Sequence, residues 1–282
     1  MRIAAGKVLM NRNAPDYLLD TTKTGYDDSK ALINTWHGKN RLMYAITPRF
    51  APTSTADQLD SAAALWSEHP DCYMQTHVSE NKGEIAWVKE LFPERKGYLD
   101  VYDHHNLCRP RAVFGHGIHL DDDEMQCMHA TGSAISHCPT SNFFLGSGYF
   151  NIHRAMDKRR PVRVGLGTDL GAGTSFSILL TLNEAYKAAQ LNNNKLTAGQ
   201  ALYLATRGTA HSMYIEDKVG SIAPGMEADI VVLNMKSTPI IEYRMQFAED
   251  IHEALFIQMT LGDDRAVHAT YVAGELRYSK DQ

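Results

Sequence analysis

Short apolar runs alternate with longer amphipathic segments along most of the chain. The runs have the length and composition of fully buried parallel strands, and the segments between them have the polar and apolar spacing of helices. Such an alternation predicts right-handed βαβ units around a parallel sheet. We predict six strands of this sheet: Arg2–Met10, Leu42–Ile46, Tyr73–His77, Ala112–His116, Ala134–His137 and Val162–Gly167.

The segments between the strands predict helices, several of which have start signals. Ser54 or Thr55 can cap a helix that runs through Glu68, and the acidic run Asp121–Glu124 suits the first turn of another. The other predicted helices lie near residues 27–37, 84–91, 176–191 and 197–206.

A closed (β/α) barrel has eight strands, so six strands predict a partial barrel domain over residues 1–215. The pattern then changes, because Gly220–Leu233 is a turn-rich lead into a single strand. Ala266–Val272 and Glu275–Tyr278 predict a hairpin that turns at Ala273–Gly274. We therefore expect a second region, residues 216–282, that contains a β appendage and a helix returning to the barrel.

Composition narrows the function classes. The chain has 282 residues, of which 44% are hydrophobic and 22% charged, values of an ordinary globular protein. Its net charge of −5 and the absence of a basic stripe argue against nucleic-acid and membrane-surface partners. No apolar run approaches the roughly 18 residues of a membrane span. The four cysteines lack CxxC spacing, which predicts free thiols in a reducing cytoplasm.

Ligand-type residues stand at the ends of three predicted strands. His77 and His116 end their strands, and Asp169 follows the last strand after Thr168. The carboxyl ends of parallel barrel strands are where such folds place their chemistry. Because a catalytic zinc usually takes three protein ligands and one water, these positions predict a hydrolytic metalloenzyme.

Several segments together resemble the amidohydrolase superfamily and, within it, the family of guanine deaminases. The resemblance covers essentially the whole chain, with its segments in the family's order. The segments that carry it are Thr47–Pro52, Thr76–Asn81, His137–Asn142, Gly167–Asp169, Pro224–Asp229 and Met259–Arg265.

The resemblance implies a (β/α)8 TIM-type barrel of the amidohydrolase kind with part of a small β-sandwich. Family members begin with strands of the sandwich and a first barrel strand that ends in a metal-binding His-x-His pair. This sequence has no His-x-His pair, and Arg2–Met10 matches the family's third barrel strand. We therefore expect an N-terminally truncated chain that lacks the first two barrel strands.

The resemblance also implies roles for the strand-end residues. His77 and Asp169 would bind one zinc ion per subunit, and Asp169 would also serve as a base for the attacking water. Glu80 would carry protons, and His116 would polarise the water. Each role has an alternative from the residue alone: a buried structural histidine for His77, a helix start for Glu80, an orienting group for His116 and a loop cap for Asp169.

Substrate recognition is expected at Arg49 and Phe50, where a guanidinium can donate to a purine and a ring can stack on it. His77, Glu80 and Asp169 would border the same substrate. A salt-bridged arginine and a core phenylalanine are the alternative. The implied reaction is the zinc-dependent hydrolytic deamination of guanine to xanthine and ammonia, in a homodimer.

Two other functions stay open at this point. A related amidohydrolase that acts on cytosine, another aminopurine or a triazine would share His77, His116 and Asp169. The Arg49–Phe50 pair and the segment Leu261–Arg265 favour guanine over these substrates. The missing His-x-His pair would also suit an inactive fragment or a non-catalytic interaction protein.

Overall fold

The computed structural model describes residues 1–281, which form two compact units. The first unit comprises Met1–Ile135 and Lys158–Arg163, and the second comprises Ser136–Asp157 and Val164–Gln282. This division rests on contacts within the chain, and the domain boundary expected near residue 215 stays a prediction. Within residues 1–281, no helix combines the length and apolar character needed to cross a bilayer.

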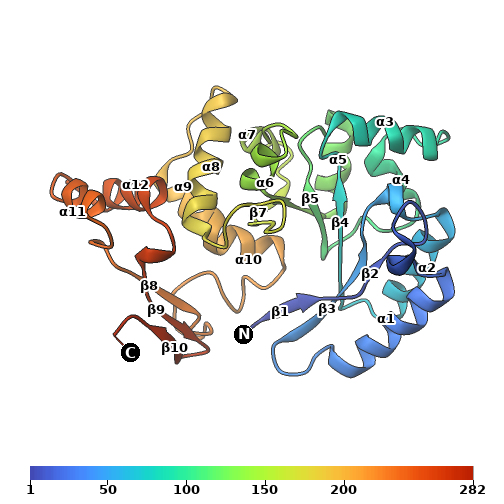
Figure 1. Cartoon of the computed structure of the whole chain (residues 1–282), viewed down its shortest axis with the longest axis horizontal. Coiled ribbons are helices and arrows are strands. Elements are labelled where there is room, and N and C mark those ends of the chain that lie inside the picture. The colour runs from blue at the N-terminus through green and yellow to red at the C-terminus, as the bar shows by residue number, and fades with distance from the viewer. Residues whose placement is uncertain (282) are drawn as a thin grey trace. The chain divides into compact units, whose positions relative to one another are not determined.

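A parallel sheet forms the centre of the first unit (Figure 1). Its strands pair in the order β1-β3-β4-β5, and β2 also pairs with β3. The strands are β1 (Ile3–Ala5), β2 (Val8–Leu9), β3 (Leu42–Pro48), β4 (Tyr73–Val78), β5 (Ala112–His116) and the start of β6 (Ala134–His137). The helices are η1 (Asp16–Leu18), α1 (Thr22–Trp36), η2 (Ala51–Thr53), α2 (Ala56–Glu68), α3 (Lys82–Leu91), α4 (Tyr98–His104) and α5 (Asp122–Thr131).

The single strand predicted over Arg2–Met10 is wrong in one respect, because it is divided into β1 and β2. Both parts keep the same register on β3, so the chain leaves the sheet and returns to it. A Cβ on Gly6 would lie 1.8 Å from the carbonyl oxygen of Ala45. The next amide, Lys7 N, donates to the hydroxyl of Tyr44 rather than to the backbone of β3. The close approach at Gly6 thus interrupts the ladder.

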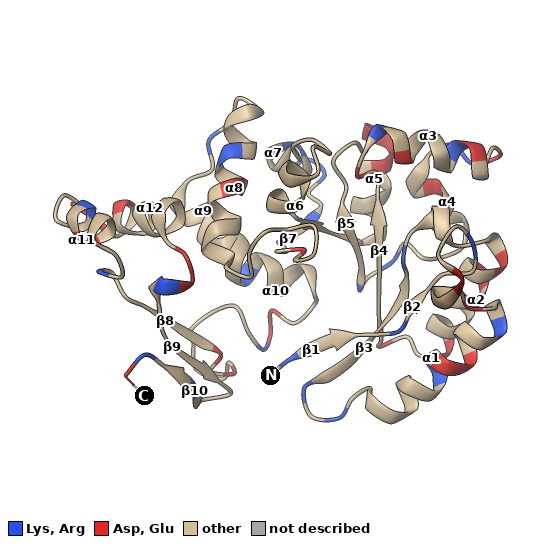
Figure 2. Cartoon of the chain, viewed as in Figure 1, with Lys and Arg blue, Asp and Glu red and all other residues tan. Residues whose placement is uncertain are grey.

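Side-chain caps set where the helices begin. The helix expected near residue 27 begins at Thr22, because Thr21 and Thr24 form a reciprocal capping box. Thr55 caps α2, as predicted, by accepting a hydrogen bond from Gln58 N. Asp121 caps α5, whose first turn is acidic (Figure 2). The short helix α4 escaped prediction because it has only seven residues and Gly97 provides no side-chain cap.

The second unit combines helices with a three-stranded antiparallel sheet of order β10-β9-β8 (Figure 1). The predicted hairpin is confirmed, with its turn at Ala273–Gly274, between the ends of β9 and β10. The strands of this antiparallel sheet are β8 (Ile230–Leu233), β9 (Val267–Val272) and β10 (Glu275–Ser279). The unit also contains most of β7 (Arg163–Leu166), which is a strand of the parallel sheet. The helices are α6 (Pro139–Phe144), α7 (Ile152–Ala155), α8 (Ile178–Leu191), α9 (Ala198–Tyr203), α10 (Thr209–Ser212), α11 (Pro239–Met245), α12 (Ile251–Leu261) and η4 (Asp264–Ala266).

The helix predicted over residues 197–206 continues further than expected. After α9 the backbone widens into a π-helical turn, Leu204–Gly208, and then enters α10. The hydroxyl of Thr209 donates to the carbonyl oxygen of Leu204 over 2.7 Å and also accepts from Leu166 N. This side chain therefore links the π-helical turn to β7, the strand that leads to Asp169.

Candidate active site

The register of β4 and β5 brings two of the predicted residues together in the first unit. His77 lies opposite Gly115, and Val78 lies opposite His116. The rings of His77 and His116 are stacked, with centroids 5.4 Å apart and planes inclined by 23°. The parallel pairing thus creates a two-imidazole cluster at the carboxyl ends of adjacent strands.

The backbone is strained where these strands end. Ser79, after β4, has φ 48°, and His116, the last residue of β5, has φ 68°. In the second unit, Asp169 after β7 also has φ 48°. Residues other than glycine rarely adopt such angles, and the cost of each is about 1–3 kcal/mol. Each of these three left-handed residues is a predicted site residue or lies next to one.

Glu80 lies within ion-pair distance of the two-imidazole cluster. Its Oε2 is 3.6 Å from Nε2 of His116, and the two side chains are 16% and 2% exposed. The sequence prediction that Glu80 and His116 act in the same place therefore agrees with their positions. A carboxylate and an imidazole at this distance can share a proton through a small shift or one water.

A backbone carbonyl fixes the tautomer of His77. Nδ1 of His77 is 2.6 Å from the carbonyl oxygen of Arg49, and it must donate because a carbonyl oxygen only accepts. Nε2 then has the lone pair that a metal ion requires. A metal-binding histidine ordinarily has its other nitrogen held in this way. His77 therefore fits the zinc-ligand role that the sequence predicted.

Tyr102, which the sequence analysis did not single out, holds the surrounding loops. Its hydroxyl, in a fully buried side chain, donates to the carbonyl oxygen of His77 over 2.8 Å. It accepts from Ala51 N, also over 2.8 Å, and lies 3.1 Å from the hydroxyl of Thr76. Burial raises the pKa of Tyr102 above its usual value, so the hydroxyl stays protonated and able to donate. Tyr102 lies on α4, which the sequence pattern did not predict, and its contact with two strand ends depends on tertiary packing.

Arg49 and Phe50 follow β3 and lie beside this cluster. The guanidinium carbon of Arg49 is 4.8 Å from the ring centroid of Phe50, a cation–π contact. Phe50 is edge-on to both His77 and Trp87, at centroid distances of 6.2 and 6.3 Å. Arg49 is exposed and Phe50 half-buried, so the alternative of a core phenylalanine is not what the structure has. Trp87 of α3 extends this aromatic wall.

A second carboxylate, Glu84, lies one helical turn after Glu80. Burial raises the pKa of Glu84, the hydrogen bond from Tyr98 opposes this shift, and the negative charge of Glu80 adds to it. Glu84 is the third residue after the helix cap Asn81, so the spacing Asn-x-x-Glu of a capping box was visible in the sequence.

Asp169 belongs to the second unit, where small residues shape the strand that leads to it. A Cβ on Gly165 would lie 2.6 Å from the hydroxyl of Ser212, and one on Gly167 would lie 2.6 Å from that of Ser136. The amide of Gly173 donates to the carbonyl oxygen of Asp169 over 2.6 Å, which closes a tight loop. His137 is buried, and its ring packs on the ring of Phe150 with centroids 5.1 Å apart.

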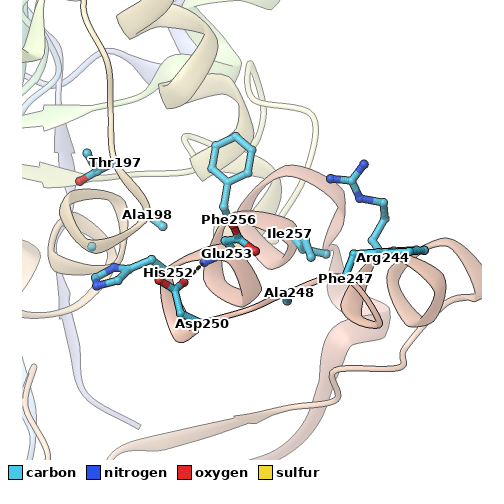
Figure 3. Close-up of a pocket in the computed structure, with 11 residues that line it drawn as sticks. Thr197, Ala198, Arg244, Phe247, Ala248, Asp250, His252, Glu253, Phe256 and Ile257 are labelled. Atoms are coloured by element: carbon cyan, nitrogen blue, oxygen red, sulfur yellow. Dashed lines mark hydrogen bonds between the residues drawn. The ribbon is translucent and has the colours of Figure 1, made fainter.

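A larger cavity lies elsewhere in the second unit. It has a volume of about 720 Å³ and lies among α9, α11 and α12 (Figure 3). Its lining includes Arg244, Phe247, His252 and Phe256, and the carboxylate of Asp250 caps α12. None of the residues predicted for chemistry lines this cavity.

Comparisons with known proteins give matches that span nearly the whole chain. Residues 1–277 match the family model described as "Amidohydrolase family". Guanine deaminase from Escherichia coli (strain K12) is 51% identical over 281 residues, which are 100% of this chain and 64% of that protein. A solved structure of E. coli guanine deaminase matches with a TM-score of 0.97 and covers 99% of this chain and 65% of that one.

A third match comes from C. acetobutylicum, whose guanine deaminase was solved with guanine bound in the active site. It is 30% identical, has a TM-score of 0.89, and covers 99% of this chain and 66% of that one. These matches confirm the predicted α/β barrel fold class. The chain spans about 64% of the length of the E. coli relative that it matches.

Proposed function

Since the chain belongs to the amidohydrolase family, we propose that its protein catalyses the hydrolytic deamination of guanine to xanthine and ammonia. Similarity to guanine deaminases from several organisms supports this substrate. The observation that carries the proposal is the cluster at the ends of β3, β4 and β5. There a tautomer-fixed imidazole, a carboxylate and an aromatic wall meet within one unit.

We propose zinc as the metal, with Nε2 of His77 as one of its ligands. The fixed Nδ1 hydrogen bond of His77 supports this assignment. A zinc ion bound there would lower the pKa of a bound water toward neutrality. Because catalytic zinc usually takes three protein ligands, His77 accounts for one part of the coordination set.

Glu80 would move the protons of the reaction. The water oxygen forms a bond to the ring carbon that bears the exocyclic amine, and a proton of the water passes to a carboxylate oxygen of Glu80. The same carboxylate returns the proton to the amine nitrogen, the carbon–nitrogen bond breaks, and ammonia leaves. His116, 3.6 Å from Glu80, would hold the water and steady the carboxylate during both transfers.

Arg49 and Phe50 would bind the purine. The exposed guanidinium of Arg49 can donate to the ring carbonyl, and the cation–π contact holds it over Phe50. Phe50 and Trp87 offer aromatic surfaces to the base. This arrangement favours a planar, carbonyl-bearing substrate over a triazine, which lacks the carbonyl acceptor.

Two further properties belong to the same proposal. The four cysteines are free, which agrees with a cytoplasmic location. Family resemblance supports a homodimer.

The direct test measures ammonia and xanthine formation by the complete gene product that contains these 282 residues, loaded with zinc. We expect turnover of guanine and much slower release of ammonia from cytosine and adenine. Glu80→Gln should retain zinc while kcat falls at least about 100-fold, because proton transfer is lost. A zinc-loaded protein that deaminates cytosine or adenine faster than guanine would contradict the substrate assignment. Unchanged kcat in Glu80→Gln would remove Glu80 from the mechanism.

A further inference from the structure

We propose that Glu84 is the positioning residue that sets the direction of the Glu80 carboxylate. The inference rests on the proposed function in so far as Glu80 is the proton carrier. The inference goes beyond that function, because Glu84 lies outside the residues proposed to contact the substrate. Its role would be to fix the turn between β4 and α3, which contains Glu80.

Both carboxylate oxygens of the buried Glu84 side chain accept hydrogen bonds, one from the turn and the other from Tyr98. Oε2 accepts from the backbone amides of Glu80 over 3.2 Å and Asn81 over 3.4 Å. Oε1 accepts from the hydroxyl of Tyr98, itself buried, over 2.5 Å. Asn81 completes the reciprocal box by accepting from Glu84 N over 2.9 Å. The carboxylate thus joins the backbone of Glu80 to the rigid interior of the unit through Tyr98.

The turn needs such an anchor because its backbone is strained. Ser79 is buried with φ 48°, and its carbonyl oxygen accepts from His119 N over 3.1 Å, which ties the turn to the loop after β5. A relaxation at Ser79 would rotate the following residue. The 3.6 Å approach of Glu80 to His116 depends on that rotation being prevented.

The next βα unit also has a buried capping-box glutamate, Glu124, but this residue does not hold the turn next to Glu80. Glu124 is also the third residue after a helix cap, Asp121, and burial raises its pKa as well. Its Oε2 accepts from Asp121 N over 3.0 Å, and its Oε1 accepts from Leu99 N over 2.9 Å. Neither amide belongs to Glu80 or Asn81, and the contacts of Glu124 with α4 are to the backbone of Leu99 and Tyr98 rather than to the Tyr98 hydroxyl. Glu124 is therefore a matched control for the structural part of the role of Glu84.

The experiment compares Glu84→Gln with Glu124→Gln in the complete, zinc-loaded gene product. A glutamine at position 124 has an N–H donor on each side, so its NH₂ group must face one of them. A glutamine at position 84 can keep its oxygen on the amides of Glu80 and Asn81 only if the hydroxyl of Tyr98 turns from donor to acceptor. Both variants should therefore lose thermal stability. Only Glu84→Gln should lower kcat for guanine, by about 10–100-fold with little change in KM, the range typical of residues that orient a catalytic group.

Two further readouts separate positioning from general loosening. Hydrogen exchange of the amides of Glu80 and Asn81 should accelerate in Glu84→Gln and stay unchanged in Glu124→Gln. Tyr98→Phe, which removes only the donor to Oε1, should lower kcat less than Glu84→Gln does.

The outcomes distinguish this proposal from the proposed function. Unchanged amide exchange at residues 80 and 81, or a kcat loss in Glu124→Gln as large as in Glu84→Gln, would overturn the positioning role. Faster exchange with unchanged kcat would overturn it too, since Glu84 would then only stabilise the helix start. If Glu80→Gln keeps full turnover, or if the unaltered protein does not act on guanine, the proposed function fails. In that case the amide exchange rates alone decide whether Glu84 fixes the turn.

Discussion

The strand ends of the first unit and the cavity of the second unit differ in size, in exposure and in how firmly their side chains are held. The first region is small and tightly held, with stacked imidazoles, left-handed residues at Ser79 and His116, and a tautomer fixed by a carbonyl. The cavity among α9, α11 and α12 is large, but exposed side chains such as Arg244 and Phe247 line it. Fixed geometry and backbone strain, rather than volume, support the strand ends as the proposed active site.

The two regions also differ in how their polar groups are held. In the first unit, the hydroxyl of Tyr102 donates to the carbonyl oxygen of His77 and accepts from Ala51 N. The carbonyl oxygen of Arg49 accepts from two nitrogens of His77, the backbone N and the ring Nδ1. In the cavity, the carboxylate of Asp250 accepts from Glu253 N of its own helix. A site that must hold atoms to within a fraction of an ångström needs the first kind of support.

Removal of the Tyr102 hydroxyl should show this difference most strongly. Tyr102→Phe leaves the buried amide of Ala51 without an acceptor, so we expect the free energy of unfolding to fall by about 1–3 kcal/mol. Tyr243→Phe on α11, an exposed tyrosine beside the cavity, should change it by less than about 0.5 kcal/mol. Denaturant unfolding of both variants measures the contrast. Equal losses would show that the strand-end network is no more tightly held than the cavity wall.

Replacement of one exposed arginine in each region, Arg49 or Arg244, should show which region binds the substrate. Arg49→Lys loses the planar stacking on Phe50, and we expect KM for guanine to rise about tenfold, which corresponds to about 1.4 kcal/mol. Arg244→Lys in the cavity should leave KM unchanged. Steady-state kinetics of the two variants provide the measurement, and an increase in KM for Arg244→Lys instead would move the substrate to the second unit.

The pH dependence of stability should have opposite signs in the two units. Burial raises the pKa of Glu84 and Glu124, so the folded state binds more protons than the unfolded state above the ordinary value of 4.5. Their contribution to stability therefore falls as pH rises through the raised pKa values. In the second unit, the hydrogen bond from Arg265 lowers the pKa of Asp263, whose contribution is lost as pH falls below 3.8.

Unfolding curves from pH 3 to 7 can check these signs. The double variant Glu84→Gln, Glu124→Gln should flatten the profile above about pH 4.5, and Asp263→Asn should flatten it only on the acid side. A double variant whose stability still falls steeply between pH 4.5 and 7 would assign that slope to other groups.

Sequence patterns predicted the elements that depend on local chemistry. The strands Ala112–His116 and Ala134–His137 have their expected bounds, and Thr55 caps its helix as expected. The interruption at Gly6 could not be predicted, because its cause is a carbonyl oxygen of another strand some 40 residues away.

The candidate site was predictable in the same way only in part. Residues at strand ends, such as His77 and His116, follow from the rule that parallel strands place polar groups at one edge. Tyr102 and Tyr98 lie on a helix too short for a periodic pattern, and their contacts with the strand ends depend on tertiary packing. Supporting residues of this kind leave little trace in a single sequence.

The most direct test of the account is the position of the metal ion, located by anomalous diffraction at the zinc edge in crystals of the complete gene product. Two other groups of ligand-type side chains lie close together in residues 1–281: His37 with Asp71 and Cys72, and Asp103 with Cys108 and Cys127. We predict a zinc peak about 2.0–2.1 Å from Nε2 of His77. A peak at either of the other two groups, with none at His77, would contradict the assignment of the strand ends as the active site.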